Sequence, residues 1–225
     1  MEDGEVFELN YVGRIKRTGE IFDLTDRETA EEEEMDTEEM DLEPAKILVG
    51  EGFIMEGLED RIKDMEVGEE RTVEVPKDDA FGSRKSENIK TISKREFEKY
   101  DVTPRRGMPV EVDGKRGKIL TVSSGRVKVD FNHPLAGRDL EYDVEVLRKV
   151  DDVEEQVRAV IDFHLDTDYD VRIEDGTVSI SMDEEIPEEA VEHLEEAVEK
   201  LSKVDSAEIS ISSGEESDEK ERKDG

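Results

Sequence analysis

The stretch NHPLAGRDLEYDVEVL, residues 132–147, contains a strand pattern without a break. In its second half Leu140, Tyr142, Val144 and Val146 alternate with acidic residues, which is typical of a strand with one buried and one exposed face. A β-branched or aliphatic residue would fill the Tyr142 position well. The ring therefore raises a question: it either fills the core or forms the wall of a site that holds a ligand.

The segments before this strand alternate between strand and helix patterns. Residues 6–13 and 19–23 read as a hairpin, and 46–50 and 71–76 as further strands. Between them, apolar residues at 54, 58, 62 and 65 fall on one helical face, and Gly68 is expected to end that helix. Residues 26–43 are an acidic excursion, with 11 of 18 positions acidic, predicted as an exposed loop or a weak helix.

Residues 83–130 differ in composition, because they hold 13 of the 32 Lys and Arg residues of the chain. A short helix is predicted over 94–100 with Ser93 as its N-cap, and strands over 110–112, 117–122 and 127–131. This segment reads as a small, mainly-β domain inserted before the strand that contains Tyr142.

After Lys149 a new pattern begins. Helices are predicted over 153–163 and 187–201, and strands over 169–173, 178–182 and 207–211, which gives an αββαβ unit. The remaining tail, residues 213–225, is acidic and without apolar residues and is predicted to be disordered.

The net charge of −34 limits the possible functions. Acidic residues are spread over every segment, so we interpret the chain as a folded protein of a high-salt cytoplasm; a nucleic-acid mimic is the alternative. Direct binding of DNA or RNA is disfavoured electrostatically. No apolar run reaches 18 residues and the N-terminus is acidic, so neither a membrane span nor an export signal is expected, and a cytoplasmic location is predicted.

The usual signs of covalent or metal chemistry are missing from the sequence. There is no cysteine, and the three histidines, His133, His164 and His193, are scattered. No nucleophile and base pair or phosphate-binding glycine loop was found, and His133 reads as a turn residue. We therefore predict no cofactor and no metal.

The ordered motifs LNYVG (9–13), GEIFD (19–23), GFIMEGLEDRI (52–62), DDAFG (78–82) and LEYDVEVL (140–147) resemble the FKBP-type peptidyl-prolyl isomerases. The insertion before NHPLAG is similar to that of the bacterial SlyD proteins, and the last unit resembles the long archaeal members. The resemblance implies an α+β fold: an FKBP-type antiparallel half-barrel wrapped on one helix, with the inserted domain and a C-terminal αββαβ domain. The implied domains are catalytic (1–83 plus 131–150), insert-in-flap (84–130) and C-terminal (151–212), followed by the tail.

The resemblance also implies a prolyl pocket without a base or a nucleophile. Its residues would be Tyr11, Phe22, Asp23, Ile54, Met55, Leu58, Phe81 and Tyr142. Family members usually have tyrosine where Phe81 stands and phenylalanine where Tyr142 stands, so one hydroxyl is missing and another is gained. This gain favours the pocket wall as the role of Tyr142.

By the same resemblance the insert would bind unfolded chains and pass their prolines to the pocket. Its candidate client-binding residues are Ile89, Ile92, Phe97, Tyr100, Val102 and Met108, which could equally form only the core of the insert. The predicted function is a prolyl cis/trans isomerase with chaperone activity, with proline-containing peptides and unfolded proteins as partners. A non-catalytic holdase on the same scaffold and a dimerisation scaffold are the alternatives, and the C-terminal unit is expected to support a homodimer.

Overall fold

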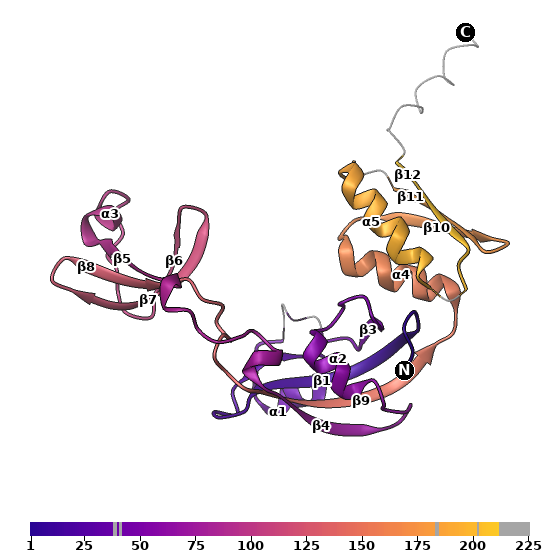
Figure 1. The fold of residues 1–225 in the computed structure, drawn as a ribbon, viewed down its shortest axis with the longest axis horizontal. Helices are drawn as coiled ribbons and strands as arrows, with labels where there is room; N and C mark the ends of the chain where they lie inside the picture. Colours follow the sequence, from indigo (N-terminus) through magenta and orange to yellow (C-terminus); the bar gives the residue numbers. More distant parts are fainter. Residues whose placement is uncertain (38–39, 41, 183–184, 202, 212–225) are drawn as a thin grey trace, which may run out of the picture. The chain divides into compact units, whose positions relative to one another are not determined.

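The computed structural model describes residues 1–37, 40, 42–182, 185–201 and 203–211 (Figure 1). By its internal contacts the chain divides into two compact units. The first contains Met1–Val12, Asp23–Val73 and Tyr142–Gly225, and the second contains Gly13–Phe22 and Glu74–Glu141. The predicted α+β class is confirmed, with antiparallel sheets and few helices.

The largest sheet has five strands in the order β2-β1-β9-β4, and β3 pairs with β1. Their bounds are β1 Val6–Ile15, β2 Ile21–Leu24, β3 Ala45–Leu48, β4 Glu70–Val75 and β9 Leu140–Val150. On β9, Leu140, Tyr142, Val144 and Val146 are all at most 4% exposed. The alternation read from the sequence is therefore confirmed, since every second residue from 140 to 146 is buried.

The helix α2, Glu56–Ile62, is shorter than the sequence pattern predicted. Met55 is its N-cap with extended backbone, and the preceding Gly50 and Gly52 have φ of +89° and +73°, so residues 50–55 cannot continue the helix upstream. The predicted stop at Gly68 is wrong as well, because the helix has already ended at Ile62.

The acidic excursion contains one short helix, α1, Arg27–Glu32. Asp26 caps it by accepting a hydrogen bond from the Thr29 amide at 2.7 Å, and Ala30 on this helix is fully buried. Of the two predictions for this segment, the weak helix is confirmed at its start. Residues 38, 39 and 41 lie outside the described part.

The inserted segment forms a separate four-stranded antiparallel sheet in the order β5-β8-β7-β6 (Figure 1). Its elements are β5 Ile89–Ser93, α3 Lys94–Glu98, β6 Pro109–Val112, β7 Lys115–Ser123 and β8 Arg126–Asp130, preceded by the 3-10 turns Lys77–Asp79 and Ser86–Asn88. Its buried core consists of Phe97, Ile119, Val127 and Val129. Strand β5 was not predicted from the sequence.

Backbone and amide hydrogen bonds join the two ends of the insert. The Gly137 amide donates to the Gly82 carbonyl at 2.6 Å. The Asn132 side chain accepts from the Lys85 amide at 2.9 Å and donates to the Lys85 carbonyl at 3.0 Å. We call Gly82, Lys85, Asn132 and Gly137 the insert clasp.

The C-terminal part has the αββαβ order predicted from the sequence. Its elements are α4 Val153–His164, β10 Tyr169–Glu174, β11 Thr177–Met182, α5 Glu188–Glu199 and β12 Ser206–Ile211. Strand β11 pairs antiparallel with β10 and parallel with β12. A parallel pair needs a crossover connection, which α5 provides. The predicted disordered tail, 213–225, lies outside the described residues.

In the described part of the chain, none of the helices has both the length and the apolar character needed to cross a membrane.

Candidate functional site

The first part of the candidate site is built on the hairpin of β1 and β2. Tyr11 on β1 donates a hydrogen bond from its hydroxyl to Asp23 on β2, with 3.1 Å between the oxygens. Thr25 fixes the backbone beside it, because its hydroxyl accepts from the Tyr11 amide at 2.9 Å and its amide donates to the Tyr11 carbonyl at 3.0 Å. The phenol and the carboxylate are thus held by strand pairing.

Tyr142 on β9 joins this pair to the start of α2. Its ring meets the Tyr11 ring edge to face, with centroids 6.1 Å apart and an angle of 65°. Its hydroxyl lies 4.0 Å from the Met55 sulfur, a weak hydrogen-bond acceptor. The side chain therefore contacts two residues of the expected pocket.

Both phenols are held in their neutral form. Burial, followed by the charge of Asp23, raises the pKa of Tyr142 to about 12. Burial also raises the pKa of Tyr11, and the hydrogen bond to Asp23 and the charge of that carboxylate act in the same direction. At neutral pH both hydroxyls therefore remain hydrogen-bond donors.

Two aliphatic residues expected in the pocket lie at the beginning of α2. Ile54 is half-buried and directly precedes the N-cap Met55. Leu58 is 3% exposed and its amide donates to the Met55 carbonyl at 2.9 Å. The first unit thus contains six of the eight predicted pocket residues, of which Tyr11, Asp23, Met55 and Tyr142 are joined by direct contacts.

The other two predicted pocket residues, Phe22 and Phe81, belong to the second unit. Phe22 is half-buried on β2. Phe81 is 38% exposed and stacks on His133, with ring centroids 4.0 Å apart and an angle of 4°. The turn role predicted for His133 is confirmed, since its Nδ1 accepts from the Leu135 amide at 3.2 Å. Its stacking partner was missed, because the two rings are far apart in sequence.

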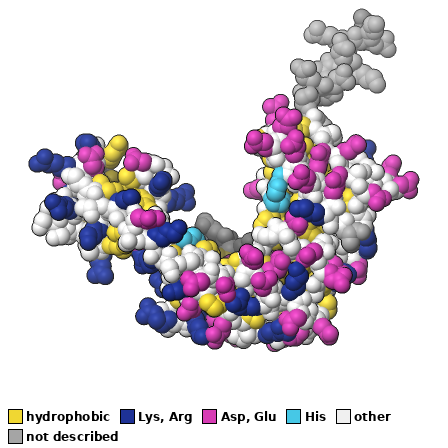
Figure 2. Space-filling model, in the orientation of Figure 1, with side chains coloured by type: hydrophobic (Ala, Val, Ile, Leu, Met, Phe, Trp, Pro, Cys, Tyr) yellow, Lys and Arg dark blue, Asp and Glu magenta, His cyan; other side chains and the backbone are white. Residues whose placement is uncertain are grey.

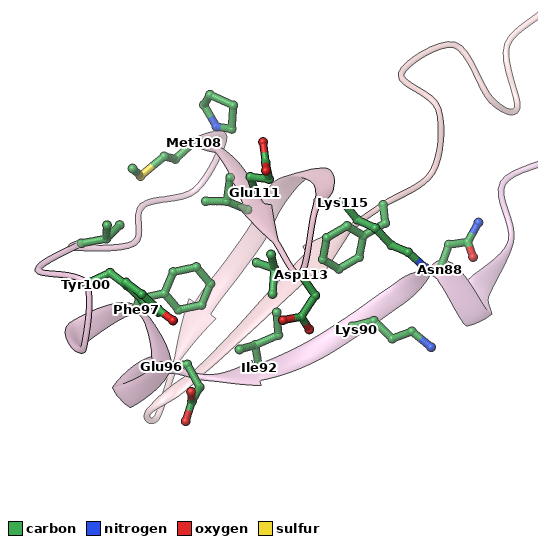
Figure 3. Close-up of a pocket in the computed structure, with 15 residues that line it drawn as sticks. Asn88, Lys90, Ile92, Glu96, Phe97, Tyr100, Met108, Glu111, Asp113 and Lys115 are labelled. Atoms are coloured by element: carbon green, nitrogen blue, oxygen red, sulfur yellow. The ribbon is translucent and has the colours of Figure 1, made fainter. Parts of the chain in front are cut away.

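The second candidate site is an open groove of about 1050 Å³ on the insert (Figure 3). Five of the six predicted client-binding residues line it, and Ile89 does not. Those five are Ile92, Phe97, Tyr100, Val102 and Met108. Phe97 also belongs to the core of the insert, whereas Tyr100 is 81% exposed. The core of the insert and the groove therefore share residues, and the groove is the exposed surface of the same apolar cluster.

Sequence reasoning missed several residues of this groove. Val110 and Phe131 contribute further apolar surface, and Lys90, Glu111 and Lys115 are among its charged residues. The strand-terminal position of Phe131 was a signal that could have identified it. Gly117 makes room for that ring: a Cβ at this position would lie 2.8 Å from Phe131 Cδ1.

The chemistry open to these sites is non-covalent. Within the ranges described, no three His, Asp or Glu side chains are grouped so that they could hold a metal ion. The first site offers one buried and one half-buried ring, one carboxylate and neutral hydroxyls, which suits an apolar ligand with a few polar groups. The second offers an apolar surface with charges of both signs at its edges.

Comparison with known proteins identifies the family of the chain. A family model described as FKBP-type peptidyl-prolyl cis-trans isomerase matches residues 1–103, and one described as FKBP26, IF domain, matches residues 90–135. The short-type peptidyl-prolyl cis-trans isomerase of Methanocaldococcus jannaschii is 33% identical over 146 residues, which cover 65% of this chain and 92% of the relative.

Two bacterial groups give similar matches. The FKBP-type 16 kDa peptidyl-prolyl cis-trans isomerase of Escherichia coli is 35% identical over 109 residues, covering 46% of this chain and 72% of the relative. The SlyD protein of Helicobacter pylori is 28% identical over 122 residues, covering 52% and 65%. With this coverage and the sheet described above, the chain belongs to the FKBP-type peptidyl-prolyl cis-trans isomerase family, and it is an isomerase of Xaa-Pro peptide bonds.

Proposed function

We propose that Tyr11, Asp23, Met55 and Tyr142 form the site at which Xaa-Pro bonds isomerise. The observation that carries this assignment is the position of Tyr142, whose buried ring contacts Tyr11 while its hydroxyl reaches Met55. The apolar side chains at the start of α2 supply the rest of the surface.

The reaction explains why such a site needs no base. Isomerisation breaks no covalent bond, and its barrier of about 18–20 kcal/mol comes from the loss of amide resonance as the bond twists. The planar amide is more polar and is better solvated by water than the twisted one. A dry pocket therefore stabilises the twisted state relative to the planar state.

The polar groups of the site would orient the substrate chain. The Tyr142 hydroxyl is the proposed donor to the substrate carbonyl, in place of the hydroxyl that Phe81 lacks. Its contact with the Met55 sulfur, at 4.0 Å, is weak, because a thioether is a poorer acceptor than a carbonyl oxygen. The pocket roles of Ile54 and Leu58, and of Phe22 and Phe81 in the second unit, remain predictions from the family resemblance.

The test is isomerase activity on a short Xaa-Pro peptide. We expect Tyr11→Ala, Asp23→Ala and Tyr142→Ala each to lower kcat/KM by roughly 10-fold or more, because each removes part of the site. Tyr169→Ala is the matched control, since Tyr169 also donates to a carboxylate, that of Asp162, but lies on β10. Equal losses in all four variants, at equal folded fractions, would refute the assignment.

A holdase with little catalysis is the second candidate, because Phe81 removes a hydroxyl that the family usually has. The same assay separates the two functions. A holdase would suppress aggregation of an unfolded protein while isomerisation of the peptide stayed at the uncatalysed rate in concentrated salt.

The groove of the insert is the proposed binding surface for unfolded proteins. Its support is an exposed aromatic ring, Tyr100, beside an adaptable Met108. We expect Tyr100→Ser to weaken binding of an unfolded protein several-fold without loss of stability, since an 81% exposed ring contributes little to the core. Unchanged binding would assign these residues to the core alone.

Two further predictions complete the proposal. A homodimer through the C-terminal part would be supported if the full chain is a dimer and a chain truncated after Val150 is a monomer; the same number of subunits in both would refute it. A cytoplasmic location is expected from the acidic composition and the lack of cysteine.

A further inference from the structure

The charge of the insert is opposite to that of the rest of the chain. Residues 83–130 contain 13 Lys and Arg against 7 Asp and Glu, a net charge of +6, so the other 177 residues carry a net charge of −40. On the side shown in Figure 2, dark blue side chains gather over β5–β8, whereas magenta ones dominate elsewhere. The unusual composition is therefore localised on one small domain.

Several of the positive charges lie on the side of the insert sheet away from its apolar core. Val127 and Val129 of β8 are fully buried in that core, so the alternating Arg126 and Lys128 point to the other side, where both are exposed. The strand register places hydroxyl residues on either side of these two cations: Ser93 and Ser123 beside Arg126, and Thr91 and Thr121 beside Lys128.

Strand β7 extends this surface. Lys118 is paired in register with Asp130 and is exposed, as is Arg116. We call Arg116, Lys118, Arg126 and Lys128 the basic face. Phe97 anchors α3 on the opposite, apolar side, so the described residues place no helix over the basic face.

In the part of the chain that the structure describes, three of the four cations of the basic face have no carboxylate partner, whereas many cations of the first unit do. In the first unit Lys46, Lys63, Arg71, Arg148, Lys149, Arg158 and Lys200 all form ion pairs. Within the described residues, no carboxylate lies within 4.0 Å of Lys118, Arg126 or Lys128; the acids of this face are Glu111, 4.0 Å from Arg116, and Asp130, paired with Arg84.

We propose that the basic face binds carboxylate-rich stretches of unfolded polypeptides, so that the insert selects acidic clients. This inference rests on the proposed client-binding role of the groove. The charges lining the groove are mixed, so the groove itself offers no preference for acidic chains. An extended segment of 20 residues spans up to about 66 Å, enough to lay apolar side chains in the groove and pass around the sheet edge to the basic face.

A polypeptide fits this surface better than a nucleic acid does. No aromatic residue is among the exposed side chains that the register places on this face, so there is no platform for stacking bases. The net charge of −34 on the full chain also opposes a polyphosphate at long range. Carboxylates spaced along a flexible chain can reach single cations and hydroxyl groups.

The test compares two fluorescent 20-residue peptides on the full-length protein. Both carry the same apolar residues, and the intervening positions are Glu in one and Gln in the other. For the wild type, we expect the Glu peptide to bind roughly 5- to 10-fold more tightly than the Gln peptide at about 0.15 M salt, with the preference decreasing as the salt concentration rises.

Two triple variants locate the preference. K118Q/R126Q/K128Q should bind both peptides equally, whereas K85Q/R95Q/R106Q, with the same change in net charge at other exposed insert positions, should keep the preference. All six side chains are exposed, so both variants should fold as the wild type does.

The outcomes separate this inference from the function on which it rests. If the wild type binds both peptides with equal affinity, or if the two variants lose the preference equally, the role of the basic face is refuted. The client-binding role of the groove is not affected by either result. Binding of neither peptide overturns both. A single-stranded oligonucleotide that binds more tightly than the Glu peptide would overturn the assignment in favour of nucleic acid.

Discussion

Tyr142 illustrates how one side chain can serve both packing and recognition. Its ring is 4% exposed on β9, and its hydroxyl lies 4.0 Å from the Met55 sulfur. Because the phenol is desolvated, its charged form is disfavoured and its pKa is about 12. The folded state therefore depends on this residue remaining neutral.

Replacing Tyr142 by Phe should make the protein less sensitive to alkali. The folded-state pKa of Tyr142 is above the unfolded value of about 10, so its contribution is complete below pH 10 and is lost as the pH rises to about 12. We expect the wild type to lose roughly 1–2 kcal/mol more unfolding free energy than Tyr142→Phe over this range. Urea unfolding at several pH values measures the difference, and parallel curves would contradict the buried phenol.

Gly117 is constrained by its neighbours rather than by its backbone angles. A Cβ there would lie 2.8 Å from the Phe131 ring and 2.9 Å from the Asp130 carbonyl oxygen, and the carbonyl cannot rotate away. Gly117→Ala should therefore destabilise the insert by about 1–3 kcal/mol, as expected for overpacking. Hydrogen exchange of β7 and β8 measures it, and the exposed Thr121→Ala on the same strand is the control, with almost no expected change.

Among the elements, α4 and α5 support the loop that leads into the proposed site. Phe163 at the end of α4 stacks on Phe53, with ring centroids 4.0 Å apart and an angle of 16°. Lys200 after α5 forms an ion pair with Glu51 at 2.6 Å. Phe53 is 9% exposed and lies two residues before Met55, so the C-terminal helices restrain the segment that positions this residue.

Removing the stacked ring should loosen this segment. Phe163→Ala should cost about 0.5–1.5 kcal/mol, the value of an aromatic pair, and speed hydrogen exchange over residues 50–55. Lys200→Gln should change stability by less, because an exposed ion pair contributes at most about 1 kcal/mol. If exchange at 50–55 stays as in the wild type after Phe163→Ala, the helices do not support the loop.

Some of the helices and strands could be predicted from the sequence alone, and others could not. Strand β9 was predicted because its alternation is complete, and α4 and α5 because their apolar stripes are long. Strand β5 was missed because Ile89 and Ile92 are three residues apart and therefore lie on opposite faces, which hides the period of two. The helix α2 was predicted too long because Ile54 and Met65 continue its apolar spacing outside the hydrogen-bonded helix.

The residues of the candidate site could be predicted from the motifs of the family, but not from the spacing of apolar residues along the chain. That Tyr11 faces Asp23 depends on the hairpin register, which alternation alone does not fix. The stack of Phe81 on His133 joins residues from the two ends of the insert, and no local pattern reports such a contact. The basic composition of the insert was visible in the sequence, but its gathering on one side of a sheet required the strand register.

For the molecule as a whole, the insert and the isomerase site should be separable. Deleting residues 84–130 and joining the ends should leave activity on a short peptide near that of the full chain. Activity on a protein whose refolding is limited by proline should fall by roughly 10- to 100-fold, because the client is no longer held at high local concentration. Equal losses on both substrates would mean that the insert is needed for the fold of the site.

The insert clasp has a consequence for how such proteins can change over time. Since Gly82 and Gly137 are joined by one backbone hydrogen bond, the points of departure and return are already neighbours. A cassette of another length or charge could be grafted between them without moving the strands that hold Tyr11 and Tyr142. The recognition preference of the enzyme could then diversify by exchange of one module while its chemistry was inherited unchanged.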